Sequence, residues 1–158
     1  MNKLKESDNR ATPKWLMAVF SDWFDPCPLN PNPTIDGLKL DWKDKTFVNP
    51  PYSNPSEWIY KAIEESKKGK TIALLMRFDP TTKYFRALIE NNAHIFYCGE
   101  RLEFINPDEP KNYKSPFPSI LVILWKMISK IILGGIIVMA IYGIVRTMML
   151  ETKNLDIN

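Results

Sequence analysis

The strongest constraint on the fold is a short apolar run in the middle of the chain. Residues 71–76 read Thr-Ile-Ala-Leu-Leu-Met, and only the first of them is polar. A run of this length and composition is typical of a strand buried inside a sheet. Helical patterns stand on either side of it, so the run predicts an α/β domain.

Strand and helix patterns alternate around this run. We expect Thr12 to cap a first helix that starts at Pro13. Asn54 should cap a second helix, with Glu57 completing a capping box. Gly69 should end this second helix. Such alternation is typical of a largely parallel sheet. The expected strands are 45–48, 71–76, 93–97, 101–105 and 119–125, and the expected helices are 13–23, 55–68 and 81–91.

Proline and charge divide the 158 residues into unlike parts. All 13 prolines lie at or before Pro118, whereas residues 119–158 are rich in Ile, Leu, Met and Val. Residues 1–125 carry 17 Lys and Arg against 16 Asp and Glu, so their net charge is no argument for nucleic-acid binding. The predicted parts are a flexible N-terminus at 1–10, one domain at 11–125, an apolar helix at 126–150 and a polar tail at 151–158.

The chain has two cysteines, Cys27 and Cys98, and one histidine, His94. Their spacing fits no zinc motif, and the first residues lack the apolar core of a signal peptide. We therefore expect a cytoplasmic domain with reduced thiols and no metal.

The sequence Asn49-Pro50-Pro51-Tyr52 directly follows the strand expected at 45–48. In open α/β sheets, ligands bind beyond the carboxyl ends of strands. The prolines have fixed φ angles and no N–H groups, so the turn is rigid and its carbonyl oxygens are free to accept. The Asn49 side-chain oxygen and a neighbouring carbonyl can then accept both hydrogens of an amino group, while Tyr52 offers a flat face to a planar base. A plain strand-ending turn is the alternative interpretation.

This arrangement suits methyl transfer to an exocyclic amine. Accepting both N–H bonds favours a lone pair localised on nitrogen, which can attack an electrophilic methyl group. Holding the two reactants at near-attack distance supplies up to roughly 7–11 kcal/mol of the barrier. Acceptors aimed at the developing positive charge supply more, and no metal is needed.

A set of short motifs accompanies this turn in a fixed order along the chain. They are Thr12-Pro13 with Trp15, Phe24-Asp25-Pro26-Cys27, Asp36-Gly37-Leu38 with Trp42, Asn49-Pro50-Pro51-Tyr52-Ser53, Trp58 with Lys61-Ala62, Leu74-Leu75, Thr81 and Gly99-Glu100-Arg101-Leu102-Glu103-Phe104. In this order they resemble the phage-type, Dam-like DNA adenine-N6 methyltransferase family. The resemblance covers about residues 11–125.

The resemblance implies a Rossmann-like domain that uses S-adenosylmethionine to methylate the N6 amino group of adenine. It also implies double-stranded DNA with a flipped adenine as the substrate, and a phage or prophage origin. Asn49, Pro50, Pro51 and Tyr52 would be catalytic, and Ser53 would contact the substrate. The implied cofactor-binding residues are Asp25, Pro26, Cys27 and Asp36.

The expected cofactor segment is short. Residues 25–33 contain no glycine, and the interval from Asp25 to Asp36 is too short for a full helix and strand. We therefore expect an abbreviated cofactor half. The alternative function is a catalytically degenerate relative that acts as a nucleic-acid-binding or membrane-anchored interaction protein.

Basic residues near the expected strand ends are candidates for DNA contact. Arg77 and Lys83 flank a loop just beyond the strand at 71–76, where a phosphate contact is one interpretation and plain surface is the other. The cluster at 64–70 mixes Glu and Lys at a helix end, which favours a solvated helix terminus over a DNA contact.

Residues 131–145 carry no charge, and extension to Leu150 adds only Arg146. Twenty helical residues span about 30 Å, the thickness of the hydrocarbon core of a bilayer. We predict a membrane helix at 131–150 that anchors the domain at the cytoplasmic face. A helix packed on the sheet or in a dimer interface is the alternative. The oligomeric state and the DNA recognition sequence are left open.

Overall fold

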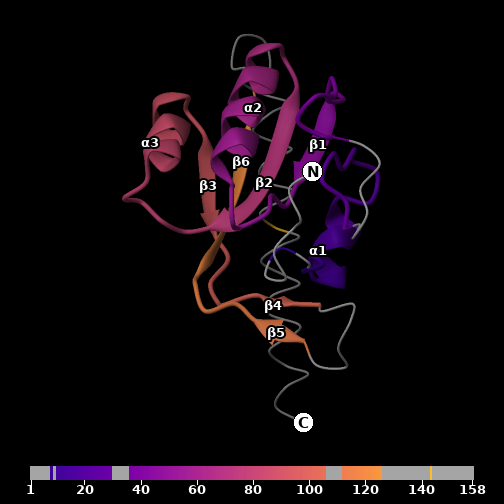
Figure 1. Ribbon diagram of the computed structural model, residues 1–158, viewed down its shortest axis with the longest axis vertical. Coiled ribbons are helices and arrows are strands. Elements are labelled where there is room, and N and C mark those ends of the chain that lie inside the picture. The colour runs from indigo at the N-terminus through magenta and orange to yellow at the C-terminus, as the bar shows by residue number, and fades with distance from the viewer. Residues whose placement is uncertain (1–7, 9, 30–35, 106–111, 126–142, 144–158) are drawn as a thin grey trace.

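The computed structural model describes residues 8, 10–29, 36–105, 112–125 and 143. They form a four-stranded sheet with helices on both faces, and a separate two-stranded ribbon (Figure 1). The expected α/β class is therefore confirmed. The elements in chain order are α1 Lys14–Val19, β1 Lys45–Val48, α2 Ser56–Lys67, β2 Thr71–Arg77, α3 Lys83–Glu90, β3 His94–Tyr97, β4 Glu103–Phe104, β5 Tyr113–Lys114 and β6 Ser119–Leu124.

The sheet has the order β1-β2-β6-β3 and is mixed, so the expectation of a largely parallel sheet is wrong. β1 pairs with β2 in parallel, but β6 lies antiparallel to both β2 and β3. The reason is the connection between β3 and β6. The described residues of this connection, 98–105 and 112–118, contain the β4–β5 ribbon and no helix. The chain returns to the sheet at the edge where β3 ended, and Cys98 N–H donates to the Ser119 carbonyl at 3.1 Å. A parallel return would need a crossover back along the sheet.

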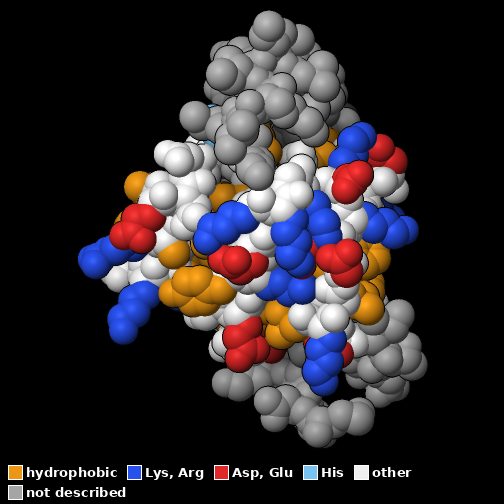
Figure 2. Space-filling model, turned by 90° about the horizontal axis from the view of Figure 1, so that it is seen from above, with side chains coloured by type: hydrophobic (Ala, Val, Ile, Leu, Met, Phe, Trp, Pro, Cys, Tyr) orange, Lys and Arg blue, Asp and Glu red, His pale blue; other side chains and the backbone are white. Residues whose placement is uncertain are grey.

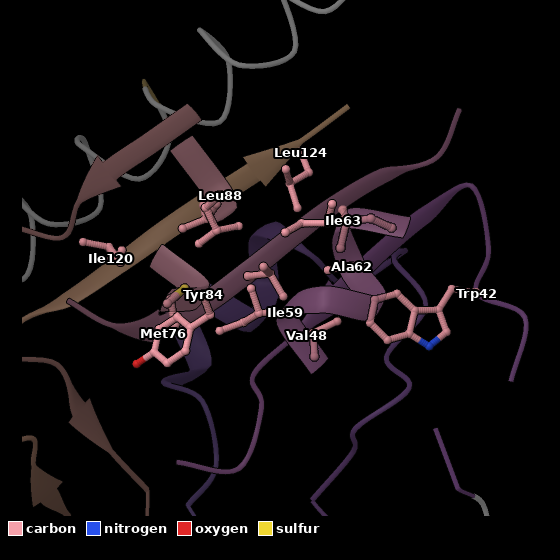
Figure 3. Packing of buried hydrophobic residues seen from close by; sticks show 13 residues of the cluster. Trp42, Val48, Ile59, Ala62, Ile63, Met76, Tyr84, Leu88, Ile120 and Leu124 are labelled. Carbon is pink, nitrogen blue, oxygen red and sulfur yellow. The ribbon is translucent and has the colours of Figure 1, made fainter. Parts of the chain in front are cut away.

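The core has two layers, one on each face of the sheet. Ala73 and Leu75 of β2 face α1, where they pack with Leu16 and Phe20. The alternate residues of the same strands face α2 and α3 (Figure 3). Because successive side chains of a strand point to opposite faces, the two layers together bury the interior residues of β2 and all of β6. This explains the continuous apolar runs in these strands. The second layer consists of Trp42, Val48, Ile59, Ala62, Ile63, Ile72, Leu74, Met76, Tyr84, Leu88, Ile120, Val122 and Leu124.

Two of the expected helix caps are wrong. α1 is shorter than expected, Pro13 occupies its N-cap position and no side chain caps it, so Thr12 is not the cap. Pro55 holds the N-cap position of α2, again without a side-chain cap. Asn54 is instead part of the preceding turn, since its N–H donates to the Pro51 carbonyl at 3.2 Å. The predicted end of α2 is confirmed, because Gly69 has a φ of 99° just after the C-cap.

The charge cluster at the end of α2 is an ion-pair network around one buried carboxylate. Glu65 is 1% exposed and accepts hydrogen bonds from Lys61, Lys68 and Lys70. Lys70 also donates to the Trp42 carbonyl and to the carboxylate of Asp41. Lys and Asp or Glu side chains are interspersed on the face seen from above, not gathered into a single basic patch (Figure 2). The cluster lies at the amino end of β2, where Thr71 is paired with Lys45, the first residue of β1.

The membrane helix predicted at 131–150 lies outside the described residues, apart from Gly143. Among the helices that the structure does describe, none combines the length and the apolar character needed to cross a bilayer.

The Glu65 network predicts a specific loss of stability in acid. Burial alone would raise the pKa of Glu65, but the hydrogen bonds from the lysines outweigh it and lower the pKa to about 2 from the ordinary 4.5. The contribution of this carboxylate is therefore fully present above about pH 4.5 and is lost as the pH falls toward 2. Glu65→Gln should lower the free energy of unfolding by roughly 1–3 kcal/mol at pH 7, and urea denaturation should show this difference shrinking between pH 4.5 and 3.

Glu64→Gln is the matched control. Glu64 is exposed and forms one ion pair with Lys67, so its replacement should leave unfolding almost unchanged. Equal effects of the two substitutions, or a Glu65→Gln difference that does not depend on pH, would contradict this account of the network.

Candidate active site

Two of the residues that the sequence predicts to be functional, Asn49 and Arg77, lie at one edge of the sheet. β1 ends at Val48 and Asn49 follows it, while its parallel neighbour β2 ends at Arg77. β6 enters the sheet at the same edge, because its first residue Ser119 is paired with Arg77. The predicted catalytic turn and a predicted DNA contact therefore share the edge at which the carboxyl ends of the strands meet, opposite the Glu65 network.

The amide nitrogen of the Asn49 side chain has a hydrogen-bond partner, whereas the amide oxygen has none among the described residues. Its Nδ2 donates to Thr12 Oγ1 at 3.1 Å. Its Oδ1 is buried and has no hydrogen-bond partner among the described residues. A buried polar oxygen without a partner costs about 1–3 kcal/mol, and native proteins keep few of them. This oxygen is therefore the strongest candidate in the turn for accepting a hydrogen bond from a ligand.

The prolines after Asn49 add a second acceptor. The Pro51 carbonyl accepts the Asn54 N–H and closes the turn. No backbone N–H of the described ranges donates to the carbonyl of Pro50, a residue that is itself buried. Since neither proline has an N–H group, the turn presents acceptors and no backbone donor at these two positions.

The Tyr52 side chain is packed with its hydroxyl end buried. Its ring meets Phe104 edge-on, with the centroids 5.9 Å apart, and its hydroxyl is buried. Burial raises the pKa of this hydroxyl, while the nearby Ser119 hydroxyl and the charge of Arg77 oppose that rise. Neither hydroxyl has a well-formed hydrogen-bond partner within the described part of the chain, so Ser119 lies near Tyr52 without regular bonding geometry. Tyr52 is thus a neutral, fixed ring at neutral pH.

The N-terminal segment also contacts this turn. Ala11 exchanges two backbone hydrogen bonds with Ile105, at 2.9 and 3.0 Å. Earlier in this segment, the Asp8 carboxylate accepts from both the backbone N–H and the hydroxyl of Ser53, at 3.0 and 2.6 Å. Asp8 lies in the part that the sequence predicts to be flexible, yet it contacts the predicted substrate residue Ser53.

The predicted cofactor residues Asp25 to Cys27 lie beside β1. Phe24 forms a parallel bridge to Thr46, with bonds of 3.0 and 2.9 Å to Lys45 and Phe47. Past this bridge the chain bends at Pro26 and Cys27. Asp25 Oδ1 accepts the Cys27 N–H at 2.8 Å.

Burial sets the ionisation of these two side chains. It raises the pKa of the Asp25 carboxyl in spite of the hydrogen bond from Cys27. Burial also raises the pKa of the Cys27 thiol to about 12, with further contributions from the negative charges of Asp25 and Asp8. The thiol stays protonated at neutral pH, so Cys27 is not an activated nucleophile.

The predicted residue Asp36 sits in a tight turn that touches the Asp25 segment. Its carboxylate accepts the Leu38 N–H at 3.1 Å and pairs with Lys39 at 3.2 Å. The next residue, Gly37, packs so closely on Pro26 that an added Cβ would lie 1.9 Å from the Pro26 carbonyl oxygen. The structure therefore brings the two predicted cofactor segments together, and the absence of a side chain at Gly37 allows this close contact with Pro26.

The predicted DNA contacts are partly engaged within the protein. Arg77 pairs with Asp79 at 3.0 Å and stacks over the exposed ring of Phe117 at 4.7 Å. Lys83 is exposed at the start of α3. Both side chains stand near the site edge, but only Lys83 presents its charge fully to solvent.

Sequence reasoning missed three residues of this site. The sequence predicts Thr12 to be a helix cap and Asp8 to be part of a flexible segment. It predicts no role for Gly37 beyond its motif. Each acts through a contact distant in sequence, with Asn49, Ser53 and Pro26 respectively. The Thr12-Pro13 and Asp36-Gly37-Leu38 motifs contain two of these residues, whereas no motif includes Asp8.

Comparison with known proteins gives a consistent result. Residues 2–153 match the model of the family described as DNA N-6-adenine-methyltransferase (Dam). The chain is 31% identical over 121 residues to the DNA N-6-adenine-methyltransferase of Haemophilus phage HP1 (strain HP1c1), a match covering 66% of this chain and 70% of that protein. It is 37% identical over 62 residues to the DNA N-6-adenine-methyltransferase of Escherichia phage T1, covering 38% of this chain and 26% of that protein. No solved structure matches significantly.

The family match extends the resemblance. The motifs in the sequence place its limit near residue 125, whereas the family model continues to residue 153. The apolar segment at 131–150 is therefore part of the match and not an addition to it.

The contact between Gly37 and Pro26 predicts a severe effect of one methyl group. Gly37→Ala should cost about 3 kcal/mol or more, because the added carbon cannot fit beside the Pro26 carbonyl without moving one segment. Gly69→Ala is the control: its φ is 99° but its Cβ position is open, so strain alone should cost about 1–2 kcal/mol. Urea denaturation compares the two, and a Gly37→Ala protein as stable as Gly69→Ala would refute the close contact.

Proposed function

Because the chain belongs to the DNA N-6-adenine-methyltransferase (Dam) family, we propose that it transfers a methyl group from S-adenosylmethionine to the N6 amino group of adenine in DNA. The observation that carries the proposal is the buried Oδ1 of Asn49, which has no partner among the described residues and lies at the carboxyl end of β1. An exocyclic amino group is the kind of donor that would satisfy it.

The turn can hold such an amino group through both of its hydrogens. Asn49 Oδ1 accepts one N–H bond and the neighbouring Pro50 carbonyl accepts the other. Two accepting oxygens favour a lone pair localised on the nitrogen and stabilise the positive charge that develops there during methyl transfer. Tyr52, whose hydroxyl is buried and whose ring contacts Phe104, would stack on the adenine ring.

Two carboxylates, Asp25 and Asp36, are the proposed contacts to S-adenosylmethionine. Asp25 provides a half-buried carboxylate beside β1, with one oxygen accepting the Cys27 N–H and the other able to accept from a hydroxyl or ammonium group. Asp36 stands in the adjoining turn, joined to the Pro26 segment through Gly37. The bound cofactor would supply the electrophilic methyl group. We propose that this compact arrangement is an abbreviated Rossmann-like cofactor half, in which the Phe24 bridge replaces a full strand beside β1.

We propose that DNA binds at the same edge of the sheet. Adenine inside a duplex cannot reach the turn, so the base would be flipped out of double-stranded DNA. Ser53, Arg77 and Lys83 are proposed to contact the flanking backbone; Ser53 and Lys83 are exposed, and Arg77 is half-buried. The phage relatives support a phage or prophage origin for the chain.

Asn49→Ala tests the proposal. Removing the acceptor should reduce transfer of labelled methyl groups from S-adenosylmethionine to DNA by about 100-fold or more, since it removes an interaction aimed at the developing charge. Asn54→Ala is the matched control, because Asn54 is an exposed asparagine of the same turn and should retain near-wild-type transfer. Circular dichroism should show both variants folded.

The same assay addresses the alternative function. A degenerate relative would bind DNA or cofactor without turnover, so wild type would transfer no more label than Asn49→Ala. That result would end the enzyme proposal and leave the binding protein as the better description.

A further inference from the structure

We propose that Thr12 is a positioning residue that fixes the plane of the Asn49 amide for adenine recognition. The inference rests on the proposed role of Asn49. It assigns a function to the Thr12-Pro13 motif, which caps no helix in this structure.

The first support is the contact itself. Asn49 Nδ2 donates to Thr12 Oγ1 at 3.1 Å across 37 residues of sequence, and Thr12 is 9% exposed. The bond occupies the nitrogen end of the amide. The oxygen end is the buried atom without a partner among the described residues, so a single hydrogen bond determines which end of Asn49 is left for a ligand.

The second support is that Thr12 is fixed from both sides. Before it, Ala11 is paired in both directions with Ile105. After it, the carbonyl of the buried Pro13 accepts the N–H groups of Leu16 and Met17 at the start of α1. The backbone at Thr12 therefore has little freedom, and its hydroxyl is a fixed point against which the Asn49 side chain is oriented.

The chemical reason is preorganisation. The terminal torsion of an asparagine side chain is soft, so an unsupported amide rotates over a broad range. Rotation would carry Oδ1 away from the amino group, or present Nδ2 to it and set two donors against each other. A hydroxyl that accepts from Nδ2 keeps the amide plane ready and spares the enzyme this reorganisation during the reaction.

The same N-terminal segment holds the other end of the turn. Asp8 accepts two hydrogen bonds from Ser53, four residues after Asn49. Thr12 differs from Asp8 because it bonds to the side chain proposed to touch the base, whereas Asp8 bonds to the exposed end of the turn. Asp8 and Thr12 thus both contact the proposed catalytic turn.

Thr12→Val tests the inference with little change of shape. The variant should lower kcat by roughly 10- to 100-fold, as expected for a misplaced catalytic group, while KM for S-adenosylmethionine changes less than about threefold. Thr12→Ser keeps the hydroxyl and should restore kcat to within a few-fold of wild type. A role in packing alone predicts no such rescue, because serine lacks the methyl group that valine retains.

Thr46→Val is the matched control for a lost buried hydroxyl. Thr46 is 0% exposed, and its Oγ1 donates to the Lys43 carbonyl at 2.9 Å, away from Asn49. It should lose stability to a similar degree as Thr12→Val and keep wild-type kcat. If Thr46→Val lost as much kcat as Thr12→Val, or if Thr12→Val kept wild-type kcat, the inference would be overturned.

A second readout does not depend on turnover. The side-chain amide signals of Asn49, assigned by their loss in Asn49→Ala, should shift and exchange faster with solvent in ¹⁵N-labelled Thr12→Val but not in Thr12→Ser. Unchanged signals in Thr12→Val would overturn the inference even if the protein methylates DNA. If the wild type transferred no methyl group but Thr12→Val still showed the expected shifts, the proposed function would be rejected. The Thr12–Asn49 contact would still be supported.

Discussion

The parallel pairing of β1 with β2 is the interaction on which the rest of the structure depends. Its register sets Val48 opposite Leu74, so that Asn49 leaves the sheet at the edge where β2 ends. Apolar layers on both faces hold this register, since a slip of one residue would exchange the two faces of each strand. The proposed catalytic turn is therefore positioned by the buried core on both faces of the sheet.

The site is assembled from segments that lie far apart in the sequence. The N-terminal segment supplies Thr12 and Asp8, the Asp25 and Asp36 turns form the proposed cofactor side, and β6 brings Ser119 against Tyr52. The acceptors of the turn, Asn49 and Pro50, directly follow β1. On this account, the proposed base-recognition side consists of Asn49, Pro50 and Tyr52, while the proposed cofactor side is reduced to two turns that meet at Gly37.

The sequence predicts those parts of the fold that depend on local patterns. The apolar runs locate β2 and β6, Gly69 marks the end of α2, and the strand before Asn49 places the turn at a carboxyl edge. The antiparallel direction of β6 could not be read in this way, because it depends on how residues 98–118 return to the sheet. Contacts such as Thr12 with Asn49 were also hidden, since a Thr-Pro pair before a helical pattern has the same sequence whether the threonine caps the helix or bonds elsewhere.

The most direct test of the central claim, that this turn presents acceptors to the amino group of adenine, is the identity of the methylated nucleoside. DNA treated with the wild-type protein and methyl-labelled S-adenosylmethionine is digested to nucleosides and separated by chromatography with mass detection. The account predicts that the label appears in N6-methyldeoxyadenosine. Label in 5-methyldeoxycytidine would contradict it, because that product requires attack at a ring carbon, and label in N4-methyldeoxycytidine would keep the amino chemistry but reject adenine as the base.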